Sequence, residues 1–247
     1  MSEAAIRRLR FASGLVLFAY ISLHLINHAL GVISLDLAER GLGLAVVVWH
    51  SRPGTVLLYG AAAVHFGLAL RTVFLRRHWR LPLIEIVRLA SGFSLPLLLI
   101  GHVVTTRVAA VFFEIPPSYA RIVTLLVASG SQGWQLALLA PGWLHGCLGL
   151  WISLRRFAWA QRWRPVLVAL VIAMPLVAAL GFLRMANEVD ISPAVVAMRQ
   201  PAAALRPGLA AWQTDLMRGY LLALGLTLVA GWLRHRWMAR QEREIRE

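Results

Sequence analysis

The sequence has no lysine, a single cysteine and few acidic residues. Its 25 basic residues are all arginine, compared with 11 acidic ones. With Cys147 alone, the chain forms no internal disulfide and holds no iron–sulfur cluster on its own thiolates, so we interpret this residue as a small apolar filler. The acidic residues fall between the long apolar runs or at their edges. This placement disfavours a proton-coupled carrier, which normally keeps a carboxylate inside the membrane.

Apolar sequence is what the chain has in abundance. Hydrophobic residues make up 59% of it and the mean hydropathy is +0.69, which is too apolar for an ordinary soluble domain. A membrane span needs about 20 apolar residues. Six runs satisfy this length, so we expect an all-α polytopic membrane protein with spans at about 11–34, 55–75, 89–113, 134–154, 165–184 and 216–233. The first run is too long for a cleavable signal peptide.

The distribution of the arginines predicts the orientation of these spans. A net charge of +14 in a soluble protein would suggest nucleic acid as a partner. Here, however, 17 of the 25 arginines lie before span 1, between spans 2 and 3, between spans 4 and 5, or after span 6. This asymmetry follows the positive-inside rule. We therefore expect a bacterial inner-membrane protein with both termini in the cytoplasm, in contact with lipid and not with nucleic acid.

The connections on the opposite side of the membrane are long. They cover residues 36–50, 116–132 and 191–212 and mix apolar with polar residues. Two interpretations fit this composition. The segments form either short helices that lie on the outer surface or simple covering loops.

The first four spans repeat one hairpin. Span 1 contains Arg10-Phe-Ala-Ser13-Gly14 and, nine residues later, a histidine; span 3 repeats this pattern at an offset of 78, as Arg88-Leu-Ala-Ser91-Gly92. Spans 2 and 4 also share a histidine pattern, at an offset of 80. Matches in matching spans indicate an internal duplication. We predict a four-helix unit at 1–156 with repeats at about 10–77 and 88–156, two further spans within 157–233, and a cytoplasmic helical linker at 234–247.

Each of the four repeated spans carries one histidine at the repeated position. A single histidine within a membrane is usually a hydrogen bond between helices, but four at repeated positions indicate a common cause. In an antiparallel bundle of cyclic order 1-2-3-4, spans 1 and 3 are diagonal, as are spans 2 and 4. Two imidazoles facing across a gap satisfy a six-coordinate haem iron. The predicted axial pairs are His24 with His102 and His65 with His145.

The depths of these two pairs leave the number of haems open. Counted from the arginines that flank the spans, the pairs differ in depth by only about 5 Å. Two haems need a larger separation, which helix tilt or kinks at Pro96 and Pro141 would have to supply. One haem with a spare histidine pair is the alternative.

Some of these motifs resemble a known family. His65-x3-Ala69-Leu70-Arg71 resembles the His-x3-Gly/Ala-Leu-Arg signature of the cytochrome b membrane anchors of succinate dehydrogenases and fumarate reductases. The pattern from His145 to Leu150 matches too, with Trp151 in place of the arginine, and the segment from Arg10 to Gly14 resembles the Arg-x-Ser-Gly motif with one extra residue. The aspartate that ends the second signature is absent. The resemblance implies histidine-ligated haem b and a quinone site near Arg10 and Ser13, and by the repeat near Arg88 and Ser91.

The six spans, the duplication and the cytoplasmic C-terminus are more similar to the diheme b-type anchor of redox-regulated class III adenylyl cyclases. That resemblance implies two haems b, a response to quinone, a homodimer and a cytoplasmic cyclase domain that follows the final segment. Residues 233–247 contain no helix breaker and carry both charge signs, which fits a helix leaving the membrane or an ordinary solvated tail. The alternative function is an electron-transfer anchor that docks a redox partner subunit. In neither case is this chain itself expected to be an enzyme.

The remaining polar residues receive subsidiary interpretations. Arg71 and Arg107 are candidates for pairing with haem propionates, because a charge within the membrane needs a counter-charge. His28 or His50 could take a proton from quinone at the outer surface, and His28 completes our set of quinone candidates. The spacing His24-x3-His28 also occurs in membrane di-iron oxygenases, but the further histidine clusters of that class are missing.

Overall fold

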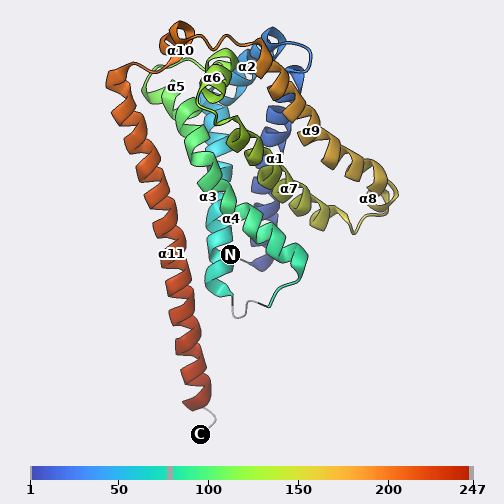
Figure 1. Ribbon diagram of the computed structural model, residues 1–247. Helices are drawn as coiled ribbons and strands as arrows, with labels where there is room; N and C mark the ends of the chain where they lie inside the picture. Colours follow the sequence, from blue (N-terminus) through green and yellow to red (C-terminus); the bar gives the residue numbers. More distant parts are fainter. Residues whose placement is uncertain (1, 77–79, 245–247) are drawn as a thin grey trace.

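The computed structural model of the protein describes residues 2–76 and 80–244, with side chains up to residue 241. Arg77, which we placed at the end of the first repeat, and residues 245–247 of the predicted linker lie outside the described residues. Every regular element of the described chain is helical. Figure 1 shows long helices crossing the molecule, with α2 (Leu35–Trp49), α6 (Tyr119–Ala128) and α10 (Pro193–Arg199) gathered at one end.

Six helices are long and apolar enough to cross a membrane, which confirms the all-α polytopic prediction. Five of them are single elements: α1 (Glu3–Leu30), α3 (Arg52–Leu75), α7 (Gln132–Leu154), α9 (Arg164–Glu188) and α11 (Arg206–Glu244). The sixth span is built from three consecutive elements: α4 (Leu83–Val103), the π-helix η1 (Val104–Val108) and α5 (Ala109–Phe112).

The ends of the first span differ from the sequence prediction. Helix α1 begins eight residues earlier, because the Ser2 hydroxyl caps it by accepting from the amide of Ala5 at 3.3 Å. It ends at Leu30, and the turn that follows leads to Ser34, which caps the next helix. Residues 31–34 are apolar enough to have been counted in the span, but they belong to this turn.

The connections opposite the arginine-rich ones are helical, so the short-helix interpretation is the one confirmed. They form α2 (Leu35–Trp49), α6 (Tyr119–Ala128) and α10 (Pro193–Arg199), which we call the helical cap, and the 3-10 turn η2 (Ala203–Leu205). Glu39 of α2 joins two of them by accepting from the Ser118 hydroxyl at 2.7 Å and from the Ala120 amide at 2.8 Å. Arg199 of α10 donates to the Ala120 carbonyl at 2.6 Å and to the Thr124 hydroxyl.

The long helices pack as two hairpins side by side. Helix α1 packs along α3, α4 packs along α7, and α1 also contacts α7. Helices α3 and α4 make almost no direct contact, and α11 packs against both of them across this seam (Figure 1). Helix α9 packs on the other side, against α1. A short helix, α8 (Ala158–Arg162), connects α7 to α9.

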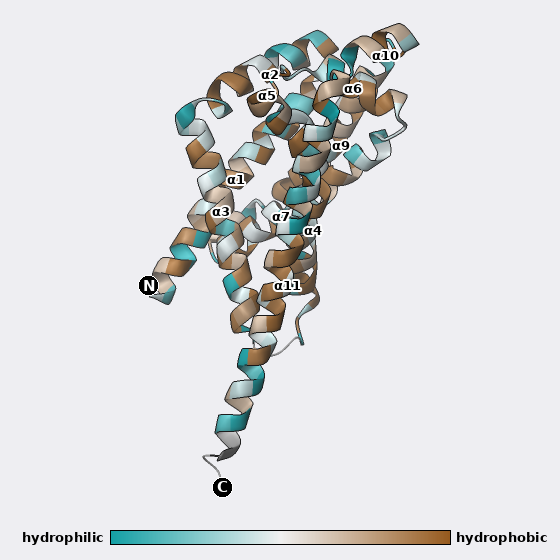
Figure 2. Ribbon diagram, turned by 90° about the vertical axis from the view of Figure 1, so that its left-hand side faces the viewer, coloured by the Kyte–Doolittle hydropathy of each residue, from teal (hydrophilic) through white to brown (hydrophobic). Residues whose placement is uncertain are grey.

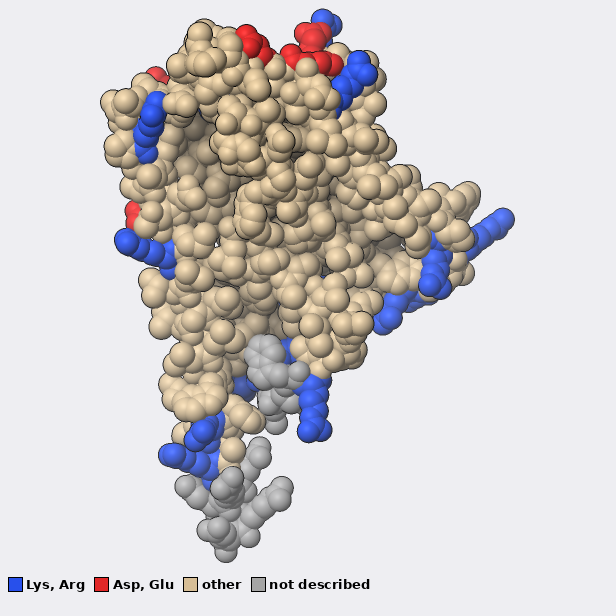
Figure 3. All heavy atoms as spheres, viewed as in Figure 1, with Lys and Arg blue, Asp and Glu red and all other residues tan. Residues whose placement is uncertain are grey.

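The surface fits a membrane environment. Figure 2 shows apolar residues along the middle of the long helices and more polar ones toward the C-terminal end of α11. Leu222 and Leu226 of α11 are 63% and 68% exposed. Exposing such apolar side chains to water is unfavourable, whereas lipid accommodates them without this cost. Figure 3 shows acidic side chains at the helical cap and arginines concentrated toward the end that holds the C-terminus. We call the latter the arginine-rich end.

Candidate functional site

Two pairs of histidines lie in the interior, each on diagonally placed helices. His24 of α1 and His102 of α4 have ring centroids 5.8 Å apart and ring planes at 71°. His65 of α3 and His145 of α7 have centroids 6.1 Å apart and planes at 88°. The structure thus brings together the two pairs that the sequence suggested. We call them the upper pair (His24, His102), near the helical cap, and the lower pair (His65, His145).

The repeated Arg-x-x-Ser-Gly motifs hold the lower pair in place. The Nδ1 atom of His145 lies 2.9 Å from the carbonyl oxygen of Arg88, and a carbonyl only accepts, so this nitrogen carries the proton. The Nδ1 atom of His65 lies 3.3 Å from the Ser13 hydroxyl, which itself donates to the carbonyl of Arg10 at 3.1 Å. Ser13 therefore accepts from His65. In both neutral rings, Nε2 keeps a lone pair for a metal.

The glycines of the same motifs make room for the lower rings. A Cβ atom on Gly92 would stand 2.5 Å from Cε1 of His145, and one on Gly14 would stand 3.1 Å from Cε1 of His65. Both glycines lie within helices, where glycine costs about 1 kcal/mol relative to alanine. Close approach of an imidazole is the physical reason for accepting that cost. The structure therefore gives the small residues of the repeat a specific role beside the histidines.

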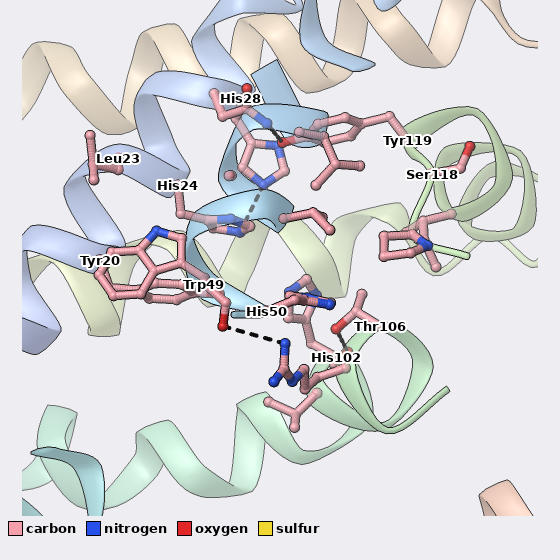
Figure 4. A pocket seen from close by; sticks show the side chains of 18 of the residues that line it. Tyr20, Leu23, His24, His28, Trp49, His50, His102, Thr106, Ser118 and Tyr119 are labelled. Atoms are coloured by element: carbon pink, nitrogen blue, oxygen red, sulfur yellow. Dashed lines mark hydrogen bonds between the residues drawn. The ribbon is translucent and has the colours of Figure 1, made fainter. Parts of the chain in front are cut away.

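The upper pair has different neighbours. The side-chain amide nitrogen of Gln135 donates to the Nδ1 atom of His102 at 3.1 Å. The Nε2 atom of His24 meets the Nε2 atom of His28 at 3.2 Å, and the ring of Tyr20 stacks on His24 at 6.0 Å. Figure 4 shows His24 and His28 one above the other on the same helix. The upper pair thus has a competing histidine, whereas the lower pair has none among the described residues.

A cavity opens beside the upper pair, beneath the helical cap. Its wall combines residues from α1, α2, α3, α6 and the α4–η1 segment, and its polar part includes His28, His50, Arg107, Tyr119 and Arg121 (Figure 4). Burial and the nearby Arg107 guanidinium lower the pKa of His50, so this ring is neutral at pH 7. Burial raises the pKa of Tyr119, whose hydroxyl accepts from the amide of Asn27 at 3.0 Å.

The π-helix η1 directs a charge toward this cavity. It begins two residues after His102, and the wide turn is supported by Thr106, whose hydroxyl donates to the His102 carbonyl at 2.6 Å. A π-helix rotates the residues that follow it relative to a regular helix and is frequent at functional sites. Arg107 lies within η1 and lines the cavity. The first repeat has no such segment in α1.

The two pairs are well separated along the bundle, which corrects the small depth difference counted from the sequence. His65 contacts Ser13, and His24 lies 11 residues further along α1, a rise of about 16 Å. The count from the arginines was wrong because those arginines are not level. Arg10 donates to Thr72 at 2.7 Å, which is four residues before Arg76, so the two reference points differ by more than a helical turn. The separation leaves room for one ligand at each pair.

The other residues suggested for a ligand lie in different places. Arg71 pairs with Glu3 at 2.8 Å at the arginine-rich end, whereas Arg107 donates to the Thr55 hydroxyl at 2.7 Å beside the upper cavity.

Of the quinone candidates, Arg10 binds α3 through Thr72 and Leu68, and Ser13 contacts His65. Ser91 donates to carbonyls of its own helix, and Arg88 lies 3.9 Å from Glu85. His28 is buried, and its Nδ1 atom has no hydrogen-bond partner among the described residues.

The spacing of both pairs fits a six-coordinate iron. A metal–imidazole nitrogen bond of about 2.0 Å and a ring radius of about 1.1 Å place two coaxial imidazole centroids about 6.2 Å apart. The observed distances are 5.8 Å and 6.1 Å. For the lower pair, the protonated Nδ1 atoms also supply the outer hydrogen bonds that ligating histidines normally make. The lower pair therefore fits haem as it stands, whereas the upper pair fits it once His24 releases its contact with His28 and the Gln135 side chain turns its amide oxygen toward His102.

Several residues of the site carried no signal in the sequence. Gln135, Tyr20 and Tyr119 follow neither the repeat nor a motif, and they are recognisable only once the fold brings them beside the histidines. Arg121 sits in a connection whose structure the sequence left open. Comparisons with protein-family models, with curated proteins and with solved structures find no match to this chain.

Proposed function

We propose that the chain is a diheme cytochrome b membrane domain that senses the redox state of quinone and relays it through α11 to a cytoplasmic adenylyl cyclase. The observation that carries this proposal is the pair of diagonal histidine contacts, 5.8 Å and 6.1 Å between ring centroids. Haem b supplies reversible one-electron chemistry when bound. His24 and His102 would hold one haem, and His65 and His145 the other.

The protein's contribution is to fix the imidazoles. At the lower pair, the Arg88 carbonyl and the Ser13 hydroxyl set the tautomer and orientation of the two rings. At the upper pair, Gln135 fixes His102, and Tyr20 stacks on His24. To hold iron, His24 would have to give up its Nε2 contact with His28. Among our quinone candidates, His28 is the only histidine, and its Nδ1 atom has no hydrogen-bond partner in the described structure, which favours it as a partner for the quinone oxygen.

The contacts of Tyr220 support the relay through α11. Its ring lies 5.7 Å from that of Phe66, the residue after His65, and its hydroxyl donates to the Phe93 carbonyl at 2.5 Å. Phe93 follows Gly92, which abuts His145. One side chain of α11 therefore touches the neighbours of both lower histidines. A change at the lower haem that moves α3 relative to α4 would therefore displace Tyr220 and, with it, α11.

The length of α11 suits an output element. Its 39 residues span about 58 Å, nearly twice the hydrocarbon thickness of about 30 Å, so the helix continues well past the membrane. The arginine-rich end, from which it emerges, would face the cytoplasm of a bacterial inner membrane. A cyclase domain following this helix would dimerise, because class III cyclases use two catalytic chains, as the resemblance implies.

The arginine-rich end also favours a second candidate function. Together with the exposed Arg155, Arg156 and Arg162 around α8, it offers a basic surface to an acidic soluble subunit. On this account the chain is the cytochrome b anchor of a quinone oxidoreductase similar to succinate dehydrogenase or fumarate reductase. The coding sequence after Glu247 separates the two: a cyclase domain supports the sensor, and a stop codon beside dehydrogenase genes supports the anchor.

The direct test of the proposed function is optical spectroscopy of the purified protein with added quinol. We expect a low-spin b-type spectrum that shifts to its reduced form when a quinol is added. His235→Ala removes a histidine at an exposed position of α11, away from both pairs, and should keep the spectrum of the native protein. Absence of a low-spin haem, or a haem that quinol leaves oxidised while dithionite reduces it, would overturn the proposal.

A further inference from the structure

Arg107 carries a charge that no acidic residue of the described chain balances. Its guanidinium donates to the Thr55 hydroxyl at 2.7 Å and to the Trp49 carbonyl at 3.5 Å, and it lies over the ring of Tyr59 at 5.7 Å. All three partners are neutral. Among the described residues, no carboxylate lies within ion-pair distance of it.

Arg121 is a second cation in the same situation. It comes from α6 of the helical cap, and its Nη2 atom donates to the carbonyl of Thr105 at 3.2 Å. Its Nε atom is buried without a hydrogen-bond partner in the described part of the chain. Burial lowers the pKa of this guanidinium, because removing a cation from water disfavours the charged form. A buried donor left without a partner costs about 1–3 kcal/mol, and more when it is charged.

Both arginines line the cavity that contains the upper histidine pair. Arg107 belongs to η1, and Arg121 of α6 contacts the carbonyl of Thr105, two residues before Arg107, so both cations lie at this π-helix. Glu39 of the cap already accepts from Ser118 and Ala120. Glu114, which lies between the two arginines in the sequence, is exposed and forms no ion pair with either of them in the described structure. Two cations around one largely apolar cavity repel each other unless an anion enters it.

We propose that Arg107 and Arg121 form a carboxylate clamp for the propionates of the haem held by His24 and His102. This inference rests on the proposed function at the upper pair and extends it to a residue, Arg121, that belongs to the helical cap and not to the bundle. A guanidinium offers parallel N–H donors that match the two oxygens of a carboxylate. The clamp orients the upper haem with its carboxylates toward the cap. Arg71, already paired with Glu3, takes no part in it.

The clamp is tested by comparing haem b with its dimethyl ester, which keeps the iron and lacks the carboxylates. A His65→Ala, His145→Ala background confines binding to the upper pair, and lipid-free detergent removes headgroup phosphate as a competing anion. We expect haem b to bind at least about tenfold more tightly than the ester, which corresponds to one or two charge-assisted hydrogen bonds. Arg107→Gln and Arg121→Gln should each reduce this preference, and the double variant should abolish it.

Matched variants separate the clamp from a purely structural role. Arg107→Lys and Arg121→Lys keep the charge and should retain part of the preference, whereas Arg40→Gln, whose arginine pairs with Asp36 on the cap surface at 2.8 Å, should retain all of it. The glutamine variants should also lower the midpoint potential of the upper haem, because losing a nearby cation favours the ferric state.

The possible failures are distinguishable. If haem b and its ester bind equally well with the same low-spin spectrum, the clamp is wrong and the proposed function stands. The clamp is also wrong if the double glutamine variant keeps the preference. If neither porphyrin gives a low-spin spectrum at the upper pair, the haem proposal at that pair fails and the clamp fails with it.

Discussion

At the scale of single residues, the placement of protons on the lower histidines decides what those rings can bind. The Arg88 carbonyl and the Ser13 hydroxyl each accept from an Nδ1 atom, so the Nε2 lone pairs remain available. The Arg-x-x-Ser-Gly motif therefore acts on the histidine of the neighbouring helix within the same repeat. Sequence comparison of the repeats identified these residues, but it did not indicate that the motif of one span positions the histidine of the next.

The glycine beside His145 provides the first residue-scale prediction. Gly92→Ala places a methyl group 2.5 Å from the imidazole, so the ring must move away from the axis it shares with His65. We expect loss of at least half of the lower haem, measured by the haem-to-protein ratio. Gly149→Ala, in the helix that carries His145 but with open space around its Cβ, is the matched control and should keep full occupancy. Equal occupancy in both variants would contradict the steric account.

The two serines of the repeat provide a second prediction, because only Ser13 contacts a histidine in the described structure. Ser91 donates to carbonyls of its own helix. Ser13→Ala removes the acceptor for the His65 Nδ1 proton, which makes the imidazole a weaker electron donor. The midpoint potential of the lower haem should therefore rise, as potentiometric titration can show. Ser91→Ala should leave the potential unchanged, and equal shifts in both variants would count against this role for Ser13.

At the scale of helices, apolar length predicted the six spans well, but it did not predict their ends or their depths. Hydrocarbon thickness sets a minimum length, and capping residues such as Ser2 decide where a helix begins. The short cap helices were ambiguous because a mixed apolar and polar segment suits both a surface helix and a loop. The depth count failed because it took Arg10 and Arg76 as level, whereas Arg10 contacts Thr72, which lies about one helical turn nearer the helical cap than Arg76.

Helix α11 is the element whose attachment matters most to the proposed relay. Tyr220→Phe keeps the ring contact with Phe66 and removes the hydrogen bond to Phe93, worth about 1 kcal/mol. We expect a smaller displacement of the C-terminal part of α11 upon haem reduction, measured as a distance between spin labels on α3 and α11. Leu222→Ala, at a lipid-exposed position of the same helix, should leave the displacement unchanged. A full displacement in Tyr220→Phe would exclude this contact from the relay.

At the scale of the whole molecule, the six spans of the described chain would place its two ends on one side of a membrane, and the arginines predict that this side is the cytoplasm. The native thiol is removed by Cys147→Ser, and single cysteines are then introduced as Ser2→Cys and Ser192→Cys. A membrane-impermeant maleimide applied to intact spheroplasts should label only the second, which lies just before α10 of the helical cap. Labelling of Ser2→Cys alone would reverse the orientation.

The molecule as a whole is two similar hairpins with α11 across their open seam, and the central claim is that each diagonal histidine pair holds one haem. The most direct test is the ratio of haem b to polypeptide in the purified protein and in variants that lack one pair. We predict two haems per chain in the native protein, and one in both the His65→Ala, His145→Ala and the His24→Ala, His102→Ala variants. A ratio that stays the same in native and variant proteins, or a native protein without haem, would contradict the account.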